Sequence, residues 1–230
     1  MTRSLSEDEA KSLRPASEHY TAYVGPPDQY DWMGGTQFAL LFLLGLREDH
    51  KVLDFGCGSL RAGRLLIAYL NPGNYYGIEP NEWLIEDAKA RQLGGMETLK
   101  SPHFSYSHSF EADVFGEKFD FIVAQSIFSH SGPELTLKAL RSFERSLLPG
   151  GLCVVTFMEG DYDTPEGWFY TGITKQGTVR YRPELIEKVI AEAGLKGVRL
   201  PWQHPRQTWW LLGHDLPPES DLALLVGRLP

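Results

Sequence analysis

The segment from Val52 to Ser59 constrains the fold of this chain more than any other. It reads Val-Leu-Asp-Phe-Gly-Cys-Gly-Ser, a short apolar run suited to a buried strand and then a Gly-x-Gly turn. Glycines let a backbone approach a bound molecule closely, and amides exposed at a helix start attract an anionic group. We therefore expect a strand, a ligand-binding turn and a helix whose apolar face is formed by Ala62, Leu65, Leu66 and Tyr69.

Short strand-like runs alternate with helical ones from Val52 onward, which is typical of a parallel sheet with crossover helices. Helices are predicted after Asn81, across Thr136 to Leu147 and from Pro183. The sequence thus predicts a doubly wound α/β domain around a mostly parallel seven-stranded sheet with an antiparallel last strand. The predicted strands are 51–55, 75–79, 103–106, 119–125, 152–158, 198–200 and 208–212.

Two further segments complete the predicted organisation. Residues 1–44 are expected to form a helical N-terminal extension, and residues 45–230 the main domain. Within the main domain, an insertion at about 159–182 is rich in Asp, Gly and aromatic residues, which favours a lid over an active site. The apolar run from Phe38 to Leu46 indicates a buried helix, because it is far shorter than a bilayer span.

Composition argues against several classes of partner. Twenty-two Lys and Arg against 30 Asp and Glu give a formal charge of −8, with no basic run to neutralise a row of phosphates. We therefore expect no nucleic acid and no membrane, and a monomer or homodimer acting on a small molecule. The charged N-terminus lacks the apolar segment of a secretory signal, which indicates the cytoplasm. Cys57 and Cys153 are expected to be buried thiols without a disulfide.

Two carboxylates stand at informative positions relative to the predicted strands. Glu79 ends the second strand 25 residues after Asp54, where a carboxylate can accept both hydroxyls of a ribose. Asp113 precedes the fourth strand, in position to accept from an adenine amino group, although Glu111 and Glu117 are nearby alternatives. Each carboxylate also has a simpler interpretation as a turn or strand-end residue.

The order of these motifs, from about Gly45 to Leu212, resembles the class I S-adenosylmethionine-dependent methyltransferase family, whose fold is Rossmann-like. The resemblance implies S-adenosyl-L-methionine as the cofactor and a methyltransferase activity. No metal is expected, because the seven histidines show no paired helical spacing and the two cysteines form no Cys-x-x-Cys pair. One departure is Leu60, which stands where the family has a third glycine, so Arg61 is expected to take part in the turn. The implied cofactor-binding residues are Asp54, Gly56, Cys57, Gly58, Ser59 and Arg61 at the first turn, Glu79 and Pro80 at the ribose, Asp113 and Val114 at the adenine, and Gln125 and Ser126 facing the sulfonium.

Methyl transfer needs alignment and, where the acceptor carries a proton, a base. His130 lies in the loop after the fourth strand and is the first candidate, with a helix-capping or solvent-facing role as the alternative. His204, in a polar and aromatic segment, is the second candidate base and a substrate-binding candidate. The remaining substrate-binding candidates are aromatic residues outside the cofactor half, for which packing is the competing explanation: Tyr20, Tyr23, Trp32, Tyr162 and Trp168.

The sequence is compatible with three hypotheses about function. The first is methyl transfer to an O or N atom of a small metabolite, with secondary metabolism as one setting. The second keeps the cofactor but changes its chemistry to cyclisation or aminocarboxypropyl transfer, which releases methylthioadenosine instead of S-adenosylhomocysteine. The third is a non-catalytic binding protein, against which the complete set of Asp54, Gly56, Gly58 and Glu79 argues.

Overall fold

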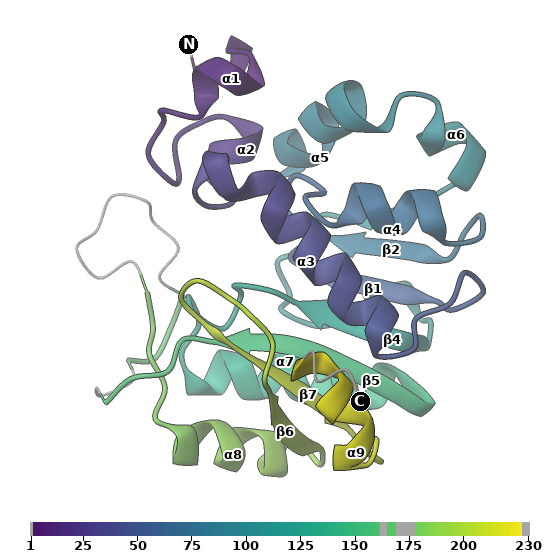
Figure 1. The fold of residues 1–230 in the computed structure, drawn as a ribbon, viewed down its shortest axis with the longest axis vertical. Coiled ribbons are helices and arrows are strands. Elements are labelled where there is room, and N and C mark those ends of the chain that lie inside the picture. The colour runs from purple at the N-terminus through teal and green to yellow at the C-terminus, as the bar shows by residue number, and fades with distance from the viewer. Residues whose placement is uncertain (1, 162–164, 169–177, 227–230) are drawn as a thin grey trace.

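The computed structural model describes residues 2–161, 165–168 and 178–226. Seven strands form one sheet in the order β3-β2-β1-β4-β5-β7-β6 (Figure 1). Neighbouring strands from β3 to β5 are parallel, whereas β7 is antiparallel to both β5 and β6. The predicted sheet is therefore confirmed. Its strands are β1 Val52–Phe55, β2 Tyr75–Ile78, β3 His103–Ser105, β4 Phe119–Ala124, β5 Leu147–Phe157, β6 Lys196–Leu200 and β7 Thr208–Gly213.

The helices connect and cover these strands, and α7 begins with Pro133, whose fixed φ suits a first helical turn. Short 3-10 turns and a π turn at Lys89–Leu93, which continues α5, complete the described elements. The helices are α1 Glu7–Ala10, α2 Tyr20–Tyr23, α3 Tyr30–Leu43, α4 Gly63–Tyr69, α5 Glu82–Ala88, α6 Met96–Lys100, α7 Pro133–Ser146, α8 Pro183–Glu192 and α9 Glu219–Leu222.

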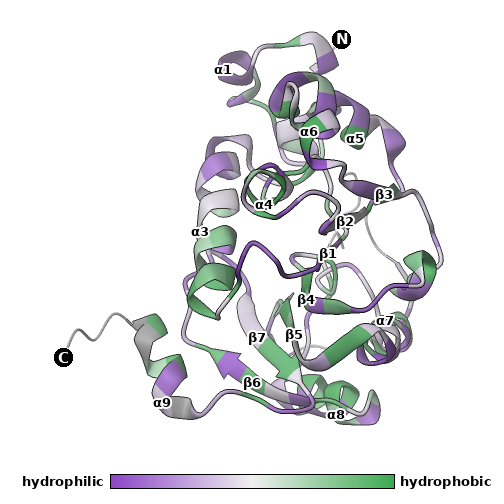
Figure 2. Ribbon diagram, turned by 90° about the vertical axis from the view of Figure 1, so that its right-hand side faces the viewer, coloured by the Kyte–Doolittle hydropathy of each residue, from purple (hydrophilic) through white to green (hydrophobic). Residues whose placement is uncertain are grey.

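Helices cover both faces of the sheet, which separates two apolar cores (Figure 2). On one face α7 and α8 pack Phe143 and Ile186 against strand residues such as Leu53. On the other face α3, α4 and α5 pack against Val52 and its neighbours. Successive strand residues point to opposite faces, so the central strands carry apolar residues on both faces, as expected for a doubly covered parallel sheet.

The structure corrects two details of the sequence interpretation. The run from Phe38 to Leu46 is only partly buried, because α3 ends at Leu43 and the Phe42 and Leu43 side chains are 45% and 52% exposed. Strand β5 begins at Leu147 rather than Leu152, since Leu147 already pairs with Phe119 before a register shift. Gly150, at φ +79°, lies within that irregularity rather than in a separate connecting turn.

The N-terminal helices pack beside α5 (Figure 1), where Arg3 Nη2 donates to Asp87 Oδ1 at 2.7 Å. Tyr20, Tyr30 and Leu84 form a small separate apolar cluster between the extension and α5. Cys57 and Cys153 are both buried free thiols. Within the described part of the chain, no helix is long and apolar enough to cross a membrane.

Candidate cofactor and acceptor site

The candidate site lies where the connections of the sheet diverge. Strand β1 has β2 on one side and β4 on the other, and all three strands point their carboxyl ends to the same edge. Ligands of open α/β sheets bind outside this edge at such a switch point. Asp54 near the end of β1, Glu79 just after β2 and Gln125 just after β4 reach it together.

The turn after β1 has the backbone conformation that its glycines permit. Gly56 and Gly58 have φ of +75° and +55°, and Leu60, which replaces a third glycine, also adopts a positive φ of +58°. A side-chain carbon on Gly56 would meet Ile127 Cδ1 at 2.1 Å, and one on Gly58 would meet Val24 Cγ1 at 2.7 Å. The Ile127 and Val24 side chains therefore pack directly on the two glycines.

Asp54 is a buried carboxyl that accepts a hydrogen bond from the Tyr75 hydroxyl at 3.0 Å. Burial raises the pKa of Asp54 to about 6, while the Tyr75 hydrogen bond and the Arg61 charge oppose this rise. The carboxylate therefore forms at neutral pH against a desolvation cost. A ligand that is cationic or donates a hydrogen bond would stabilise the charged form of Asp54.

Glu79 is also buried and organises the turn beside it. Its Oε2 accepts from the Gly58 amide at 3.2 Å, and its Oε1 accepts from the Asn81 backbone at 2.8 Å and side chain at 2.6 Å. Burial raises the pKa of Glu79, and the hydrogen bonds from Asn81 and Gly58 and the nearby His108 oppose the rise. Glu79 thus links the ends of β1 and β2 and retains further acceptor capacity.

The N-terminal extension covers this part of the site. Arg61 Nη1 donates to the Val24 carbonyl at 2.9 Å, and the Tyr30 hydroxyl donates to the Ser59 carbonyl at 2.8 Å. Gly34 in α3 permits this approach, because a side-chain carbon there would lie 2.3 Å from the Arg61 carbonyl oxygen. Hydrogen bonds therefore connect the predicted turn residues Ser59 and Arg61 to the N-terminal extension.

Ser126, Gln207 and His204 form a polar network beside Gln125. The Ser126 amide donates to Thr156 Oγ1 at 2.7 Å, and Gln207 Nε2 donates to Ser126 Oγ at 2.9 Å. Ser126 has a φ of +62°, a strained conformation for a residue with a side chain. These contacts hold the loop after β4 against the loop between β6 and β7.

His204 is held as a neutral imidazole with a defined tautomer. Its Nδ1 accepts from the backbone amides of Arg206 at 3.1 Å and Gln207 at 2.9 Å, so the ring proton lies on Nε2. Burial, together with the charges of Arg206 and Arg61, lowers the pKa of His204 to about 4. His204 is therefore a hydrogen-bond donor at neutral pH, which argues against its role as a base.

The Gln125 side chain faces this donor. One end of its amide lies 3.4 Å from His204 Nε2, and the donor character of that nitrogen assigns the amide oxygen to this end. The other end of the Gln125 amide is buried and has no hydrogen-bond partner among the described residues.

His130 lies in the loop after β4, with its ring centroid 5.9 Å from that of Trp168. Trp168 also contacts Phe110, with ring centroids 5.5 Å apart. The loop is well anchored, since the Tyr181 hydroxyl donates to the Ser131 carbonyl at 2.5 Å and shares a hydrogen bond of 2.8 Å with Thr136 Oγ1. The structure thus brings His130, the candidate base, next to Trp168, a candidate substrate-binding residue.

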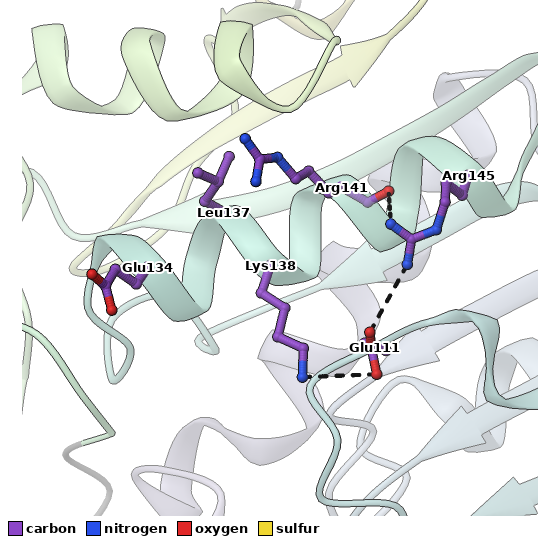
Figure 3. Close-up of a pocket in the computed structure, with 6 residues that line it drawn as sticks. All are labelled: Glu111, Glu134, Leu137, Lys138, Arg141 and Arg145. Carbon is purple, nitrogen blue, oxygen red and sulfur yellow. Dashed lines mark hydrogen bonds and ion pairs between the residues drawn. The ribbon is translucent and has the colours of Figure 1, made fainter.

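Other predicted residues are not brought to this group. Asp113 is exposed and accepts from Arg145 Nη2 at 2.9 Å, in the last turn of α7, which ends at the opposite edge of the sheet. Val114 follows it in the same exposed turn. That surface carries a shallow pocket of about 280 Å³ along α7, where Lys138 and Arg145 point toward Glu111 (Figure 3).

The remaining aromatic candidates differ in their surroundings. Tyr20 is buried within the extension, where its hydroxyl donates to Glu7. Tyr23 packs on Trp83 with ring centroids 5.1 Å apart, and the charge of Glu79 contributes to raising its pKa, which places it at the site. Trp32 is 40% exposed on α3. Tyr162 lies outside the described residues, as do the other residues of 162–164 and 169–177 in the predicted insertion.

Several residues at the site were not predicted from the sequence. They are Tyr75, Asn81 and Val24, which contact predicted residues or cover them. Asn81 had a local signal, since it follows Glu79 by two residues in a turn. The others are distant in the chain, and only the fold brings them to the site.

Comparison with known proteins agrees with this doubly wound fold. Residues 53–153 match the family model of a methyltransferase domain. This segment runs from β1 into β5, and together with the strand order it supports the resemblance of this chain to the class I S-adenosylmethionine-dependent methyltransferases.

Solved structures share the fold at low sequence identity. Magnesium protoporphyrin IX methyltransferase from Synechocystis PCC 6803, with bound S-adenosylmethionine, is 13% identical over 92% of this chain and 96% of that chain, with a TM-score of 0.60. The CcbJ methyltransferase from Streptomyces caelestis is 15% identical over 86% and 95%, with a TM-score of 0.61. DesVI from Streptomyces venezuelae is 18% identical over 83% and 94%, with a TM-score of 0.57. These similarities establish the fold.

Proposed function

We propose that this protein transfers a methyl group from S-adenosylmethionine to an oxygen or nitrogen atom of a small-molecule acceptor. The observation that carries the proposal is the convergence of a positive-φ glycine turn with two buried carboxylates, Asp54 and Glu79, at the switch point of the sheet. A structural scaffold has no need of two desolvated acids at this edge.

The residues present fit the cofactor. Gly56 and Gly58 leave a backbone surface with no side chain of its own, and Glu79 retains acceptor capacity for ribose hydroxyls. Asp54 would attract the positive charge of the methionine portion, and Arg61 its carboxylate. When bound, S-adenosylmethionine supplies a methyl group activated by the positive charge of its sulfonium.

The chain's contribution is to position the acceptor and to exclude water. Val24 and Tyr23 cover the turn from the N-terminal side, and the network of Ser126 and Gln207 closes the opposite side. Alignment of reacting groups within such an enclosure accounts for much of the rate of a displacement reaction.

We assign the general-base role to His130 where the acceptor loses a proton. His130 lies in the loop after β4 beside Trp168, whereas His204 Nδ1 already accepts two amides and its pKa lies about 4. Asp113 is left without a role in this proposal, because its carboxylate pairs with Arg145 on the surface.

Calorimetric titration with S-adenosylmethionine and S-adenosylhomocysteine tests the cofactor assignment. We expect saturable binding that Asp54→Ala and Glu79→Gln each weaken at least about tenfold, the loss of one charge-assisted hydrogen bond. Asp49→Asn, a change at an exposed carboxylate before β1, is the matched control. Wild-type affinity in both site variants would contradict the assignment.

Product analysis tests the reaction itself. Release of S-adenosylhomocysteine in the presence of an acceptor supports methyl transfer, whereas release of methylthioadenosine identifies another use of the cofactor. His130→Ala should lower turnover while leaving cofactor affinity nearly unchanged. An unchanged rate would remove the base role from His130.

A further inference from the structure

Two arginine side chains from distant parts of the chain converge beside the candidate site. A side-chain carbon on Gly25 would lie 3.5 Å from Arg61 Nη1 and 4.0 Å from Arg206 Nη2. Arg61 follows the glycine turn after β1, and Arg206 belongs to the loop between β6 and β7. The two guanidinium groups therefore approach the same point, between the N-terminal extension and the loop that carries His204.

The charges of both arginines act on the His204 side chain. Both Arg206 and Arg61 contribute to lowering the pKa of His204, so both lie close to its ring. Arg61 donates to the Val24 carbonyl. By contrast, Arg206 is exposed, and its guanidinium has no hydrogen-bond or ion-pair partner among the described residues. An anion at this point is attracted by both positive charges.

Neighbouring amide side chains also lack partners. Gln125 is 7% exposed, and the end of its amide turned away from His204 is buried without a hydrogen bond among the described residues. Gln207 donates to Ser126, but its Oε1 is likewise buried without such a partner. Buried polar groups are nearly always satisfied in folded proteins, so unsatisfied ones at a ligand site indicate groups that the ligand supplies.

We propose that the acceptor carries a carboxylate, which Arg206 binds through its guanidinium, with the Gln125 and Gln207 amides contacting the adjoining polar atoms. The single positive charge of the Arg206 guanidinium balances the single negative charge of a carboxylate. Its two coplanar N–H groups can also donate to both carboxylate oxygens. The inference rests on the proposed function, and it makes Arg206 a residue that determines specificity for carboxylate-bearing acceptors.

The cofactor also has a carboxylate, so the test must separate the two sources. Wild-type protein saturated with S-adenosylhomocysteine is titrated with benzoate and acetate as anionic probes, and with benzamide and acetamide as neutral counterparts. Binding is followed through the side-chain Nε–H resonances of ¹⁵N-labelled arginine and by calorimetry. We expect saturable shifts of the Arg206 resonance with the carboxylates and none with the amides.

Two variants make the test specific. Arg206→Gln should weaken benzoate binding about tenfold or more, the loss of a charge-assisted hydrogen bond, while leaving S-adenosylhomocysteine affinity within about twofold. Arg141→Gln removes another exposed arginine, on the outer face of α7 (Figure 3), and should change neither affinity.

Each outcome decides a different claim. Equal binding of carboxylates and amides, or no benzoate binding to protein that binds S-adenosylhomocysteine, overturns the carboxylate inference and leaves the proposed function standing. A tenfold loss of S-adenosylhomocysteine affinity in Arg206→Gln assigns the arginine to the cofactor and also overturns the inference. No S-adenosylhomocysteine binding by the wild type overturns the proposed function itself.

Discussion

Replacing Asp54 with asparagine should stabilise the folded protein at neutral pH while weakening its binding of the cofactor. Asp54 lies near the end of β1, is 5% exposed, and accepts one hydrogen bond, from the Tyr75 hydroxyl. An asparagine keeps an oxygen for that hydroxyl and removes the charge that is costly to bury. The ionised Asp54 side chain therefore lowers the stability of the ligand-free protein.

The magnitude follows from the pKa of the carboxyl. Burial raises the pKa of Asp54 from 3.8 to about 6 in the folded protein. Between these values the unfolded chain has lost the proton while the folded protein keeps it, so a rise in pH lowers the free energy of unfolding. At about 1.4 kcal/mol for each pH unit, the cost reaches roughly 3 kcal/mol above pH 6 and about half of that at pH 5.

Urea denaturation at pH 5 and pH 7.5 measures this difference. The unfolding free energy of Asp54→Asn should exceed that of the wild type by up to about 3 kcal/mol at pH 7.5 and by less at pH 5. The exposed Asp49→Asn variant should show no such pH-dependent gain. A variant less stable than the wild type at pH 7.5, or a gain equal at both pH values, would refute the reasoning.

The remaining predictions concern the ligand and the neighbouring groups. Affinity for S-adenosylmethionine should rise from pH 5 to 7 and then level off, because the cationic ligand favours ionised Asp54, whereas the same calorimetric titration of Asp54→Asn should be nearly flat. Gly58→Ala should weaken S-adenosylhomocysteine binding at least about tenfold, because φ at Gly58 is +55°, and Gly35→Ala, where an added carbon meets nothing within 4 Å, should leave calorimetric affinity unchanged. His204→Asn should leave the shape of the pH–rate profile between pH 5 and 8 unchanged, since the pKa of His204 lies about 4; loss of an ionisation step in that range would show that His204 titrates during turnover. Asp113→Asn should keep cofactor affinity within about twofold and cost at most about 1 kcal/mol in a denaturation experiment, as for an exposed ion pair, and a tenfold loss of affinity would return Asp113 to the adenine site.

Local patterns were sufficient for the sheet and for the centre of the candidate site. The apolar run before Gly56 predicted β1, and the glycines predicted a turn, in which the structure shows both Gly56 and Gly58 at positive φ. Asp54 and Glu79 were predicted from their places near the ends of strands, because parallel strands bring their carboxyl ends to one edge. Strand order and direction then follow from the alternation of strands and helices.

Irregular segments were predicted less well. Asp113 lies between β3 and β4, where no helix or strand periodicity indicates which way a side chain points. In the structure its carboxylate accepts a hydrogen bond from Arg145. The start of β5 was placed too late, because Pro149 and Gly150 are typical of a connecting turn but lie within an irregular strand. Both differences arise where a residue's position depends on a partner elsewhere in the chain.

The sequence by itself therefore determined the sheet, the turn and the two buried acids, because these depend on residues close together in the chain or on strand periodicity. Only the tertiary structure decided that Val24 covers the turn, that His204 is a neutral donor, and that Arg206 approaches Arg61. Each of these depends on contacts between segments far apart in the sequence, and burial and charge at such contacts are set by packing rather than by local pattern.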